Sequence, residues 1–301
     1  MYTLKWEKFK YSSEQFGLWR ILFGLYLVYY YFGLLPYGTE LFSRDGFVAD
    51  FVLGNRTLFP EFMLNWDSAT QVQIMIGLCG LFSILITLGY FRKVAAFGLW
   101  LLTMWFYNRN PYTNSPEYSF INWLIFACMF IPTGEAFSIG KKDPNWKMPK
   151  YFYWGAWILL VVGYGYSGSA KFKAMDENWL NGTAMYYVLV TDNARLHWYG
   201  QLFDAIPKVF FIPVSWGALA CQTFAPVFAY FRKLRPWWWL ISTLVHIGLL
   251  LLVNVAQVSS GMIIFHLFVF DSRWIRGLKF IKKGYLEKIV LLRPRPGLTT
   301  N

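Results

Sequence analysis

Two lysines, Lys171 and Lys173, follow an apolar, helix-like run without charge in the stretch GYGYSGSAKFKAMDENWLNGTAM. A lysine amine that low-dielectric surroundings keep neutral can act as a general base or a nucleophile. One helical face carries Tyr164, Ser167, Gly168 and Lys171, so we expect Lys171 to face protein. The alternative is a lysine that snorkels to the membrane surface and marks the end of a helix, an interpretation that suits Lys173 better.

A histidine in a second apolar run is the next candidate. His246, in STLVHIGLLLLVN, follows Trp237 by a helix length of about 13 Å, and an ionisable residue at that depth in a membrane is a functional candidate. The alternative is a neutral imidazole that is hydrogen-bonded to a neighbouring helix or to Ser242. His266, in IIFHLFVFD, is interpreted as a packing residue. The histidines stand in separate segments without a spacing such as HExxH, so no metal is expected.

A polar connection, NRNPYTNSPEY over 108–118, offers further donors. Its asparagines and prolines indicate an ordered turn, in which Asn108, Arg109 and Asn110 supply amide and guanidinium donors. The alternative is a solvated loop. We also assign Tyr164 and Asn254 to the candidate pocket, with His246 at its floor.

The composition indicates that lipid surrounds most of the chain. Of the 301 residues, 56% are hydrophobic and 22% are aromatic, and the mean hydropathy is +0.36. These values exceed those of ordinary soluble domains. Segments that could cross a bilayer are expected over 17–36, 71–90, 94–107, 118–133, 151–171, 209–231, 237–254 and 257–272. The predicted fold is therefore an all-α bundle of about eight transmembrane helices. The third, fourth and eighth segments are short, so six or seven spans remain an alternative.

Charge in the connections predicts the topology, because short cytoplasmic loops collect lysine and arginine. Basic residues gather before the first segment, after the second, fourth and sixth, and after the eighth, whereas 37–70 is acidic. We therefore expect both termini in the cytoplasm, a transmembrane domain over 1–272 and a basic cytoplasmic tail over 273–301. This topology and anionic headgroups explain the net charge of +12, so nucleic acid is not expected as a partner.

Five stretches together carry a family resemblance. They are FGLWRILFGLYLVYYYF, NRNPYTNSPEYSFINWLIFACMFIPTGEAFSI, YSGSAKFK followed by NWLNGTAMYYVL, FAPVFAYFRKLRPWWWLISTLVHIGLLLL, and FHLFVFD. In this order and spacing the chain resembles the HTTM domain family over most of its length. That domain is the membrane part of vitamin K-dependent gamma-carboxylase and also occurs in many shorter bacterial proteins.

The resemblance implies a catalytic base. In the carboxylases, a lysine between a small-residue helix end and a Trp-x-x-Gly segment deprotonates reduced vitamin K. SGSAKF with NWLNG matches this pattern at Lys171, Trp179 and Gly182. Oxygen then produces a strong base that removes a γ-proton from a glutamate, to which carbon dioxide adds. We expect Lys171 and His246 to be catalytic, and the cofactor to be a reduced quinone of the vitamin K or menaquinone type.

Two departures from the animal carboxylases limit what the resemblance implies. Those enzymes have a histidine just before the fourth apolar segment, where this chain has Ser115-Pro116-Glu117-Tyr118. They also continue into a large luminal domain that recognises a propeptide, whereas this sequence ends in the basic tail, so we expect substrate recognition to differ. Short members of the sporulation-delaying protein B type resemble the chain in size and are tied to maturation of a secreted peptide toxin.

Three functions follow as hypotheses, each with membrane lipid as a partner. The first is an enzyme that uses a quinone to modify a peptide or lipid at the outer face of a bacterial cytoplasmic membrane. The second is a non-enzymatic maturation, transport or immunity partner of a secreted peptide. The third is a structural subunit of a larger membrane complex.

Overall fold

The computed structural model describes residues 11–47, 65–191 and 197–276. Within these ranges the chain consists of helices and their connections, without a β-strand, so the predicted all-α class is confirmed. By its internal contacts the chain divides into two units, Met1–Val269 and Phe270–Asn301. In the second unit the structure describes a short helix, α15 (Arg273–Arg276). Most of the predicted basic tail lies outside the described residues.

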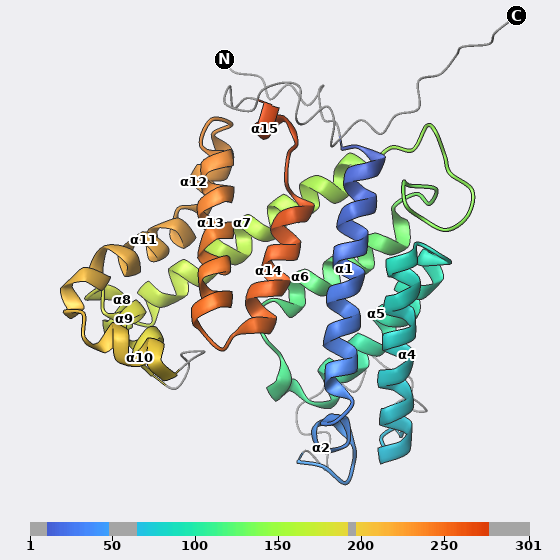
Figure 1. Cartoon of the computed structure of the whole chain (residues 1–301), viewed down its shortest axis with the longest axis horizontal. Helices are drawn as coiled ribbons and strands as arrows, with labels where there is room; N and C mark the ends of the chain where they lie inside the picture. The colour runs from blue at the N-terminus through green and yellow to red at the C-terminus, as the bar shows by residue number, and fades with distance from the viewer. Residues whose placement is uncertain (1–10, 48–64, 192–196, 277–301) are drawn as a thin grey trace, which may run out of the picture. The chain divides into compact units, whose positions relative to one another are not determined.

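Every predicted apolar segment falls on helix (Figure 1). Single helices account for all but the sixth: α1 (Ser13–Leu34), α4 (Ala69–Leu88), α5 (Arg92–Arg109), α6 (Tyr118–Phe130), α7 (Lys150–Lys173), α13 (Arg235–Leu252) and α14 (Ala256–Phe268). The sixth is divided into the 3-10 helix η4 (Lys208–Phe211), α11 (Ile212–Thr223) and α12 (Ala225–Tyr230). Pro226 near the start of α12 explains the break, because proline cannot donate a helical hydrogen bond.

Fewer helices are long and apolar enough to cross a membrane than the eight segments that the sequence predicts. Among the described residues, α4 and α13 are long and apolar enough to cross a membrane, and a third span results if Trp198–Asp204 and Lys208–Thr223, bent by 106°, count as one. α6 and α14 have 13 residues each, about 20 Å of helix against a hydrocarbon core of about 30 Å. α1 and α7 are longer, but their tyrosines and tryptophans lower the mean hydropathy. Eight spans are therefore not confirmed.

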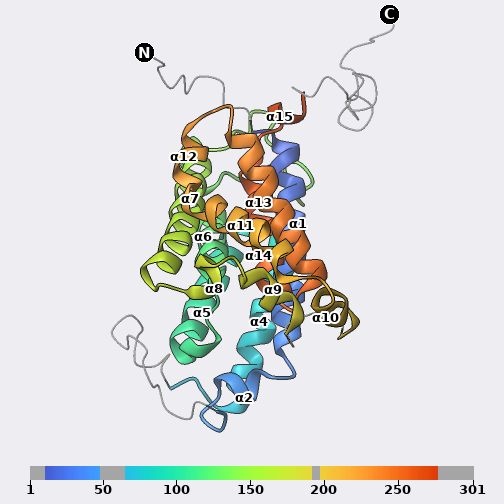
Figure 2. The ribbon, with the colours of Figure 1, turned by 90° about the vertical axis from the view of Figure 1, so that its left-hand side faces the viewer.

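The long helices pack in two groups that α14 connects. In the first group, α1 packs along α4, α4 on α5, and α5 on α6. Gly24 allows the close approach of α1 and α4, since a Cβ there would lie 2.2 Å from Oγ1 of Thr87. In the second group, α7 packs against α11 and α12, and α13 packs against α14 (Figure 2). α14 also contacts α1, α6 and α7.

Short helices fill the connections. They are α2 (Gly38–Phe42), η3 (Pro111–Thr113), α8 (Glu177–Leu180), α9 (Ala184–Val190) and α10 (His197–Asp204). A small apolar core of Tyr186, Leu189, Phe211 and Val253 joins α9 to η4 and to the end of α13. The described parts of the connection between α7 and α11 are therefore packed against the helices, although the connection is too short for a separate domain.

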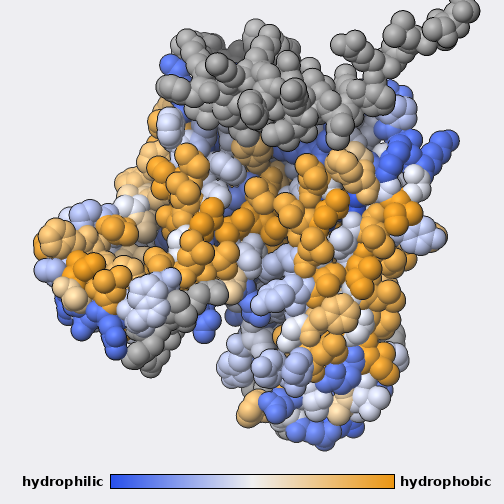
Figure 3. Space-filling model, viewed as in Figure 1, coloured by the Kyte–Doolittle hydropathy of each residue, from blue (hydrophilic) through white to orange (hydrophobic). Residues whose placement is uncertain are grey.

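Exposed apolar side chains cover the faces of several long helices. Figure 3 shows them as a broad hydrophobic surface over α13, α14, α1 and α4. On α13, Leu244 is 55% exposed and Leu251 is 61% exposed. Soluble monomers rarely expose apolar surface on this scale, so these faces are compatible with contact to lipid.

Candidate functional site

Lys171 lies half-buried on the face of α7 that meets α11. Its Nζ donates hydrogen bonds to Oε1 of Gln222 at 2.8 Å, to Oγ of Ser167 at 3.0 Å and to the backbone oxygen of Ser167 at 3.1 Å. Nζ also lies 4.8 Å from the centre of the Trp179 ring, which attracts a cation through its π electrons. Lys173 is exposed. The lysine that was predicted to face protein therefore does so.

A close contact between α7 and α11 creates this environment. A Cβ at Gly168 would lie 2.5 Å from both the backbone nitrogen and Oγ1 of Thr223. With glycine there, the two backbones approach closely, and Gln222 in the last turn of α11 reaches Lys171. Small residues allow this kind of approach between membrane helices.

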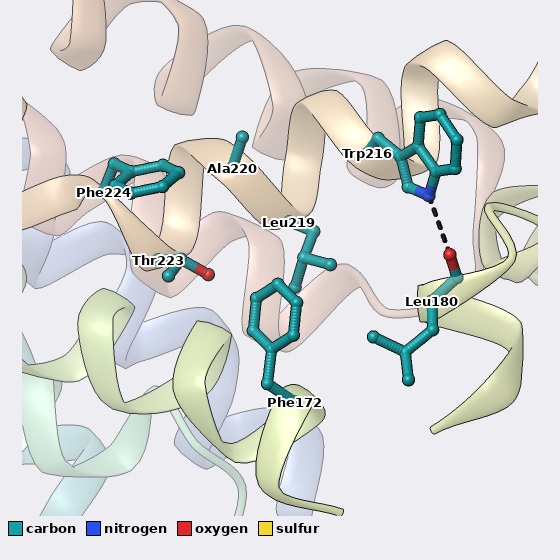
Figure 4. A pocket seen from close by; sticks show the side chains of 7 residues that line it. All are labelled: Phe172, Leu180, Trp216, Leu219, Ala220, Thr223 and Phe224. Atoms are coloured by element: carbon teal, nitrogen blue, oxygen red, sulfur yellow. Dashed lines mark hydrogen bonds between the residues drawn. The ribbon is translucent and has the colours of Figure 1, made fainter. Parts of the chain in front are cut away.

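An apolar pocket of about 220 Å³ lies between the end of α7, α8 and α11 (Figure 4). It is lined by Phe172, Leu180, Trp216, Leu219, Ala220, Thr223 and Phe224. Three of these residues directly follow the lysine and its partners in the chain: Phe172 follows Lys171, Leu180 follows Trp179, and Thr223 follows Gln222. Because a dry cavity of about 150 Å³ holds benzene, this pocket has room for a larger aromatic ring.

The turn from α8 to α9 fixes one wall of the pocket. Asp176 caps α8 by accepting hydrogen bonds from the backbone nitrogens of Asn178 and Trp179. Gly182 has φ +82, a left-handed conformation that favours glycine, and a Cβ there would lie 2.8 Å from Ile212 of α11. Nε1 of Trp216 donates a 3.1 Å hydrogen bond to the backbone oxygen of Leu180. The close approach at Gly182 and the hydrogen bond from Trp216 to Leu180 thus hold this turn against α11.

A second polar group lies deeper along α7. The hydroxyl of Tyr164 lies 2.7 Å from Nε2 of His246 on α13 and 2.9 Å from Nε2 of His266 on α14. Tyr164 and His266 are buried, and Nδ1 of both histidines is buried without a hydrogen-bond partner. Tyr164 precedes Lys171 by seven residues, which is about 10 Å along the helix. The structure brings Tyr164 and His246 together, but next to His266 rather than beside Lys171.

Polar contacts of α11 with α13 lie between these two groups. Sγ of Cys221 lies 3.3 Å from Oγ of Ser242, and Nε1 of Trp238 donates a 2.9 Å hydrogen bond to the backbone oxygen of Cys221. Cys221 directly precedes Gln222, the partner of Lys171, while Ser242 lies one turn before His246. The two polar groups therefore share α7, and these contacts connect α11 of the first group to α13 of the second.

The residues of the 108–118 connection lie elsewhere. Nδ2 of Asn108 donates to the backbone oxygen of Met104. Arg109, fully buried, donates from Nε to the backbone oxygen of Phe42, and Nδ2 of Asn110 donates to that of Leu41. The latter two hold the connection against α2, which Figure 1 shows apart from α8. The structure does not bring these three residues to Lys171. Their side chains donate instead to backbone oxygens of α5 and α2.

Two further polar residues, Asn254 and Glu117, also make no hydrogen bond to Lys171. Asn254 is exposed in the connection between α13 and α14. Glu117, which the sequence analysis did not select, is fully buried: Oε2 accepts a hydrogen bond from Ser115 and Oε1 has no partner. Burial raises the pKa of its carboxyl. A Cβ at Gly261 of α14 would lie 3.1 Å from Cγ of Glu117 and 3.0 Å from the hydroxyl of Tyr26.

No family model, curated protein or solved structure matches the chain. The candidate site therefore stands on its own geometry: a half-buried amine with fixed acceptors, and an apolar pocket lined by the residues that follow Lys171, Trp179 and Gln222 in the chain. Sequence reasoning missed Gln222 and the pairing of His266 with Tyr164. A glutamine inside the apolar stretch ALACQTFAPVF was the available signal for the first, and a second histidine in an apolar segment was the signal for the other.

Proposed function

We propose that this protein is a membrane enzyme of the HTTM type that uses a reduced quinone to modify a peptide or a lipid at the outer membrane face. The observation that carries the proposal is the position of Lys171. Its amine is half-buried and fixed by Gln222 and Ser167, and the next residue, Phe172, lines an apolar pocket large enough for an aromatic ring. A site for a quinone requires both elements, an apolar ring pocket and a base at its edge.

Each residue of the site has a role in this proposal. Neutral Lys171 would accept a proton at Nζ from a ring hydroxyl, which low-dielectric surroundings favour. Gln222 and Ser167 would hold the amine in one orientation, and Trp179 would stabilise the ammonium that forms. Phe172, Trp216 and the other apolar lining residues would exclude water. A reduced quinone would supply the acidic hydroxyl and the reducing equivalents for a reaction with oxygen.

The proposal includes an eight-segment topology with both termini in the cytoplasm of a bacterial cell. The basic connections then face the cytoplasm, and the Lys171 end of α7 faces outward. The short helices α6 and α14 fit this arrangement because longer helices pack against both of them. Labelling of single cysteines introduced at exposed Lys147 and Lys173 with a membrane-impermeant reagent checks it: position 173 should react in intact cells, and position 147 only after permeabilisation.

The enzymatic test uses the purified wild type, Lys171→Ala and a matched control, Lys173→Ala. Each is incubated with reduced menaquinone or vitamin K, oxygen and labelled bicarbonate, and mass spectrometry follows quinones and co-expressed peptides. We expect quinone epoxide from the wild type and from Lys173→Ala but not from Lys171→Ala. Label in a peptide would identify a carboxylase, and epoxide without label a related oxidation. Absence of turnover in folded wild type with every reduced quinone would refute the enzyme proposal.

A further inference from the structure

A second cavity, of about 410 Å³, lies at the opposite ends of the helices from Lys171 in the proposed topology, between the α4–α5 turn and the connection that follows α6. We call it the basic pocket. It is lined by Gly89, Tyr90, Phe91, Arg92, Lys93, Val94, Thr133, Gly134, Ser138, Ile139 and Lys141. Three of these residues carry positive charge and none carries negative charge.

Buried charge behind the basic pocket is not balanced. Arg20 of α1, Arg92 of α5 and Glu135 are all fully buried. Nε of Arg20 lies 3.0 Å from Oε1 of Glu135, and Nε of Arg92 lies 3.1 Å from the same oxygen. Two guanidinium groups therefore share one carboxylate, and the cluster retains a net charge of one. An uncompensated charge in a protein interior is costly, so an anion nearby would stabilise it.

The two arginines differ in how far their donors are satisfied. Arg92 donates to the backbone oxygens of Cys128, Ile131 and Pro132 as well as to Glu135. Nη1 of Arg20 donates to backbone oxygens at the end of α4. Its Nη2 is buried without a hydrogen-bond partner. The buried guanidinium donor of the cluster that lacks an acceptor therefore belongs to Arg20.

This guanidinium lies directly behind the wall of the basic pocket. A Cβ at Gly89 would lie 2.9 Å from Cζ of Arg20 and 2.6 Å from Cβ of Ser138, and both Gly89 and Ser138 line the pocket. Gly89 also has φ +68 at the C-terminal end of α4. Glycine at this position thus allows the Arg20 guanidinium and Ser138 to approach the end of α4 closely.

The first turn of α5 adds donors on the other side. Phe91 precedes this helix of 18 residues with φ 44, and Arg92, Lys93 and Val94 of the first turn line the pocket. Backbone amides at a helix N-terminus have no intrahelical acceptor and bind anions, most often phosphate groups. Lysine ammonium groups bind phosphate as point charges. The pocket thus combines amide donors, lysines and a buried excess of positive charge.

We propose that the basic pocket binds the phosphate group of an anionic ligand, with Lys93 and Lys141 as its side-chain contacts. In the proposed topology the pocket faces the cytoplasmic leaflet, where anionic lipid headgroups present this group at a high local concentration. A free phosphate has the same chemistry, so the experiment separates the two sources. This inference does not depend on quinone chemistry at Lys171.

The test compares the full-length wild type with Lys93→Gln/Lys141→Gln and with a control, Lys147→Gln/Lys150→Gln, which removes equal charge outside the pocket. Native mass spectrometry measures retained phosphatidylglycerol against phosphatidylcholine, and thermal unfolding is followed in inorganic phosphate against chloride at equal ionic strength. Loss of two lysine contacts should weaken phosphatidylglycerol binding by about 30-fold. The control variant should bind like the wild type.

Each outcome has a defined meaning. Selective loss in Lys93→Gln/Lys141→Gln supports the pocket as a lipid site, and protection by inorganic phosphate at millimolar concentration supports a free phosphate as the ligand. Equal losses in both double variants would reduce the effect to general surface charge and overturn the proposal. Absence of selective phosphatidylglycerol or phosphate binding in the wild type would also overturn it. Size-exclusion profiles of all variants establish that they are folded.

Discussion

The hydroxyl of Tyr164 lies 2.7 Å from Nε2 of His246 and, at the same time, 2.9 Å from Nε2 of His266. A phenol has one proton to donate, so with both rings neutral one imidazole accepts from the hydroxyl and the other donates to it. The two histidines must therefore be opposite tautomers. This arrangement joins α7, α13 and α14 by a short chain of directional hydrogen bonds in the interior.

Tyr164→Phe tests the contribution of this chain to stability. The substitution keeps the ring and leaves a buried nitrogen on each histidine without its partner. We expect a loss of about 1–3 kcal/mol in the free energy of unfolding. Thermal or denaturant unfolding in detergent measures it, with Tyr166→Phe as the control because Tyr166 is 74% exposed. Equal stability of the two variants would mean that the contacts contribute nothing.

The contact between Gly168 and Thr223 makes a second prediction. Gly168→Ala places a Cβ 2.5 Å from the backbone of α11, so the helices must separate and the hydrogen bond from Lys171 to Gln222 lengthens. We expect a loss of stability of about 1–3 kcal/mol. Gly217 also lies on α11, but a Cβ there would meet no atom within 4 Å. Gly217→Ala should therefore stabilise the protein by up to about 1 kcal/mol through helix propensity. Equal effects of the two substitutions would contradict the close approach of α7 and α11.

The pairing of Lys171 with Gln222 predicts a pH-dependent phenotype, provided that the protein is a Lys171-dependent enzyme. Gln222→Glu would put a carboxylate in place of the amide oxygen 2.8 Å from Nζ and favour the ammonium form. Because the base must be neutral to accept a proton, the rise of activity with pH should move about 1–3 units higher. Gln222→Leu should lower kcat by about 10- to 100-fold through loss of orientation. A pH profile unchanged in Gln222→Glu would exclude Lys171 as the base.

The sequence predicted the helices well because they follow from local composition. Each apolar segment became helix, and Lys171 faced protein as its shared face with Ser167 and Gly168 indicated. The grouping of polar residues was less predictable. Arg109 and Asn110 bond to backbone near α2, a partner 60 or more residues away that no local pattern specifies.

The buried ion pairs show why some polar contacts could not be predicted from the sequence. Arg20 and Glu135 lie 115 positions apart, and their ion pair depends on how α1 packs against the segment after α6. In the sequence, Arg92 resembled a basic residue that only marks a cytoplasmic loop. Its complete burial among backbone oxygens is a tertiary property, so loop charge alone could not distinguish it from exposed Lys150.

Glu117 predicts how stability depends on pH. Burial raises its carboxyl pKa, and the groups that face it are Ser115, Tyr26 of α1, Tyr107 of α5 and Tyr118 of α6, whereas α14 presents Gly261. The folded state thus binds a proton more tightly than the unfolded state, so this group's contribution is greatest at low pH. It declines as pH rises from the unfolded pKa to the raised folded pKa.

Glu117→Gln is uncharged at every pH and should remove that decline. Because a shift of one unit corresponds to about 1.4 kcal/mol, the variant should gain stability on the order of 1 kcal/mol over wild type at pH 8, and the gain should vanish near pH 4. Unfolding midpoints in detergent between these limits measure the effect, with exposed Glu14→Gln as the control. A constant difference between Glu117→Gln and wild type across the range would show that folding leaves the pKa of Glu117 unchanged, as a cation or water at its unpaired Oε1 would cause.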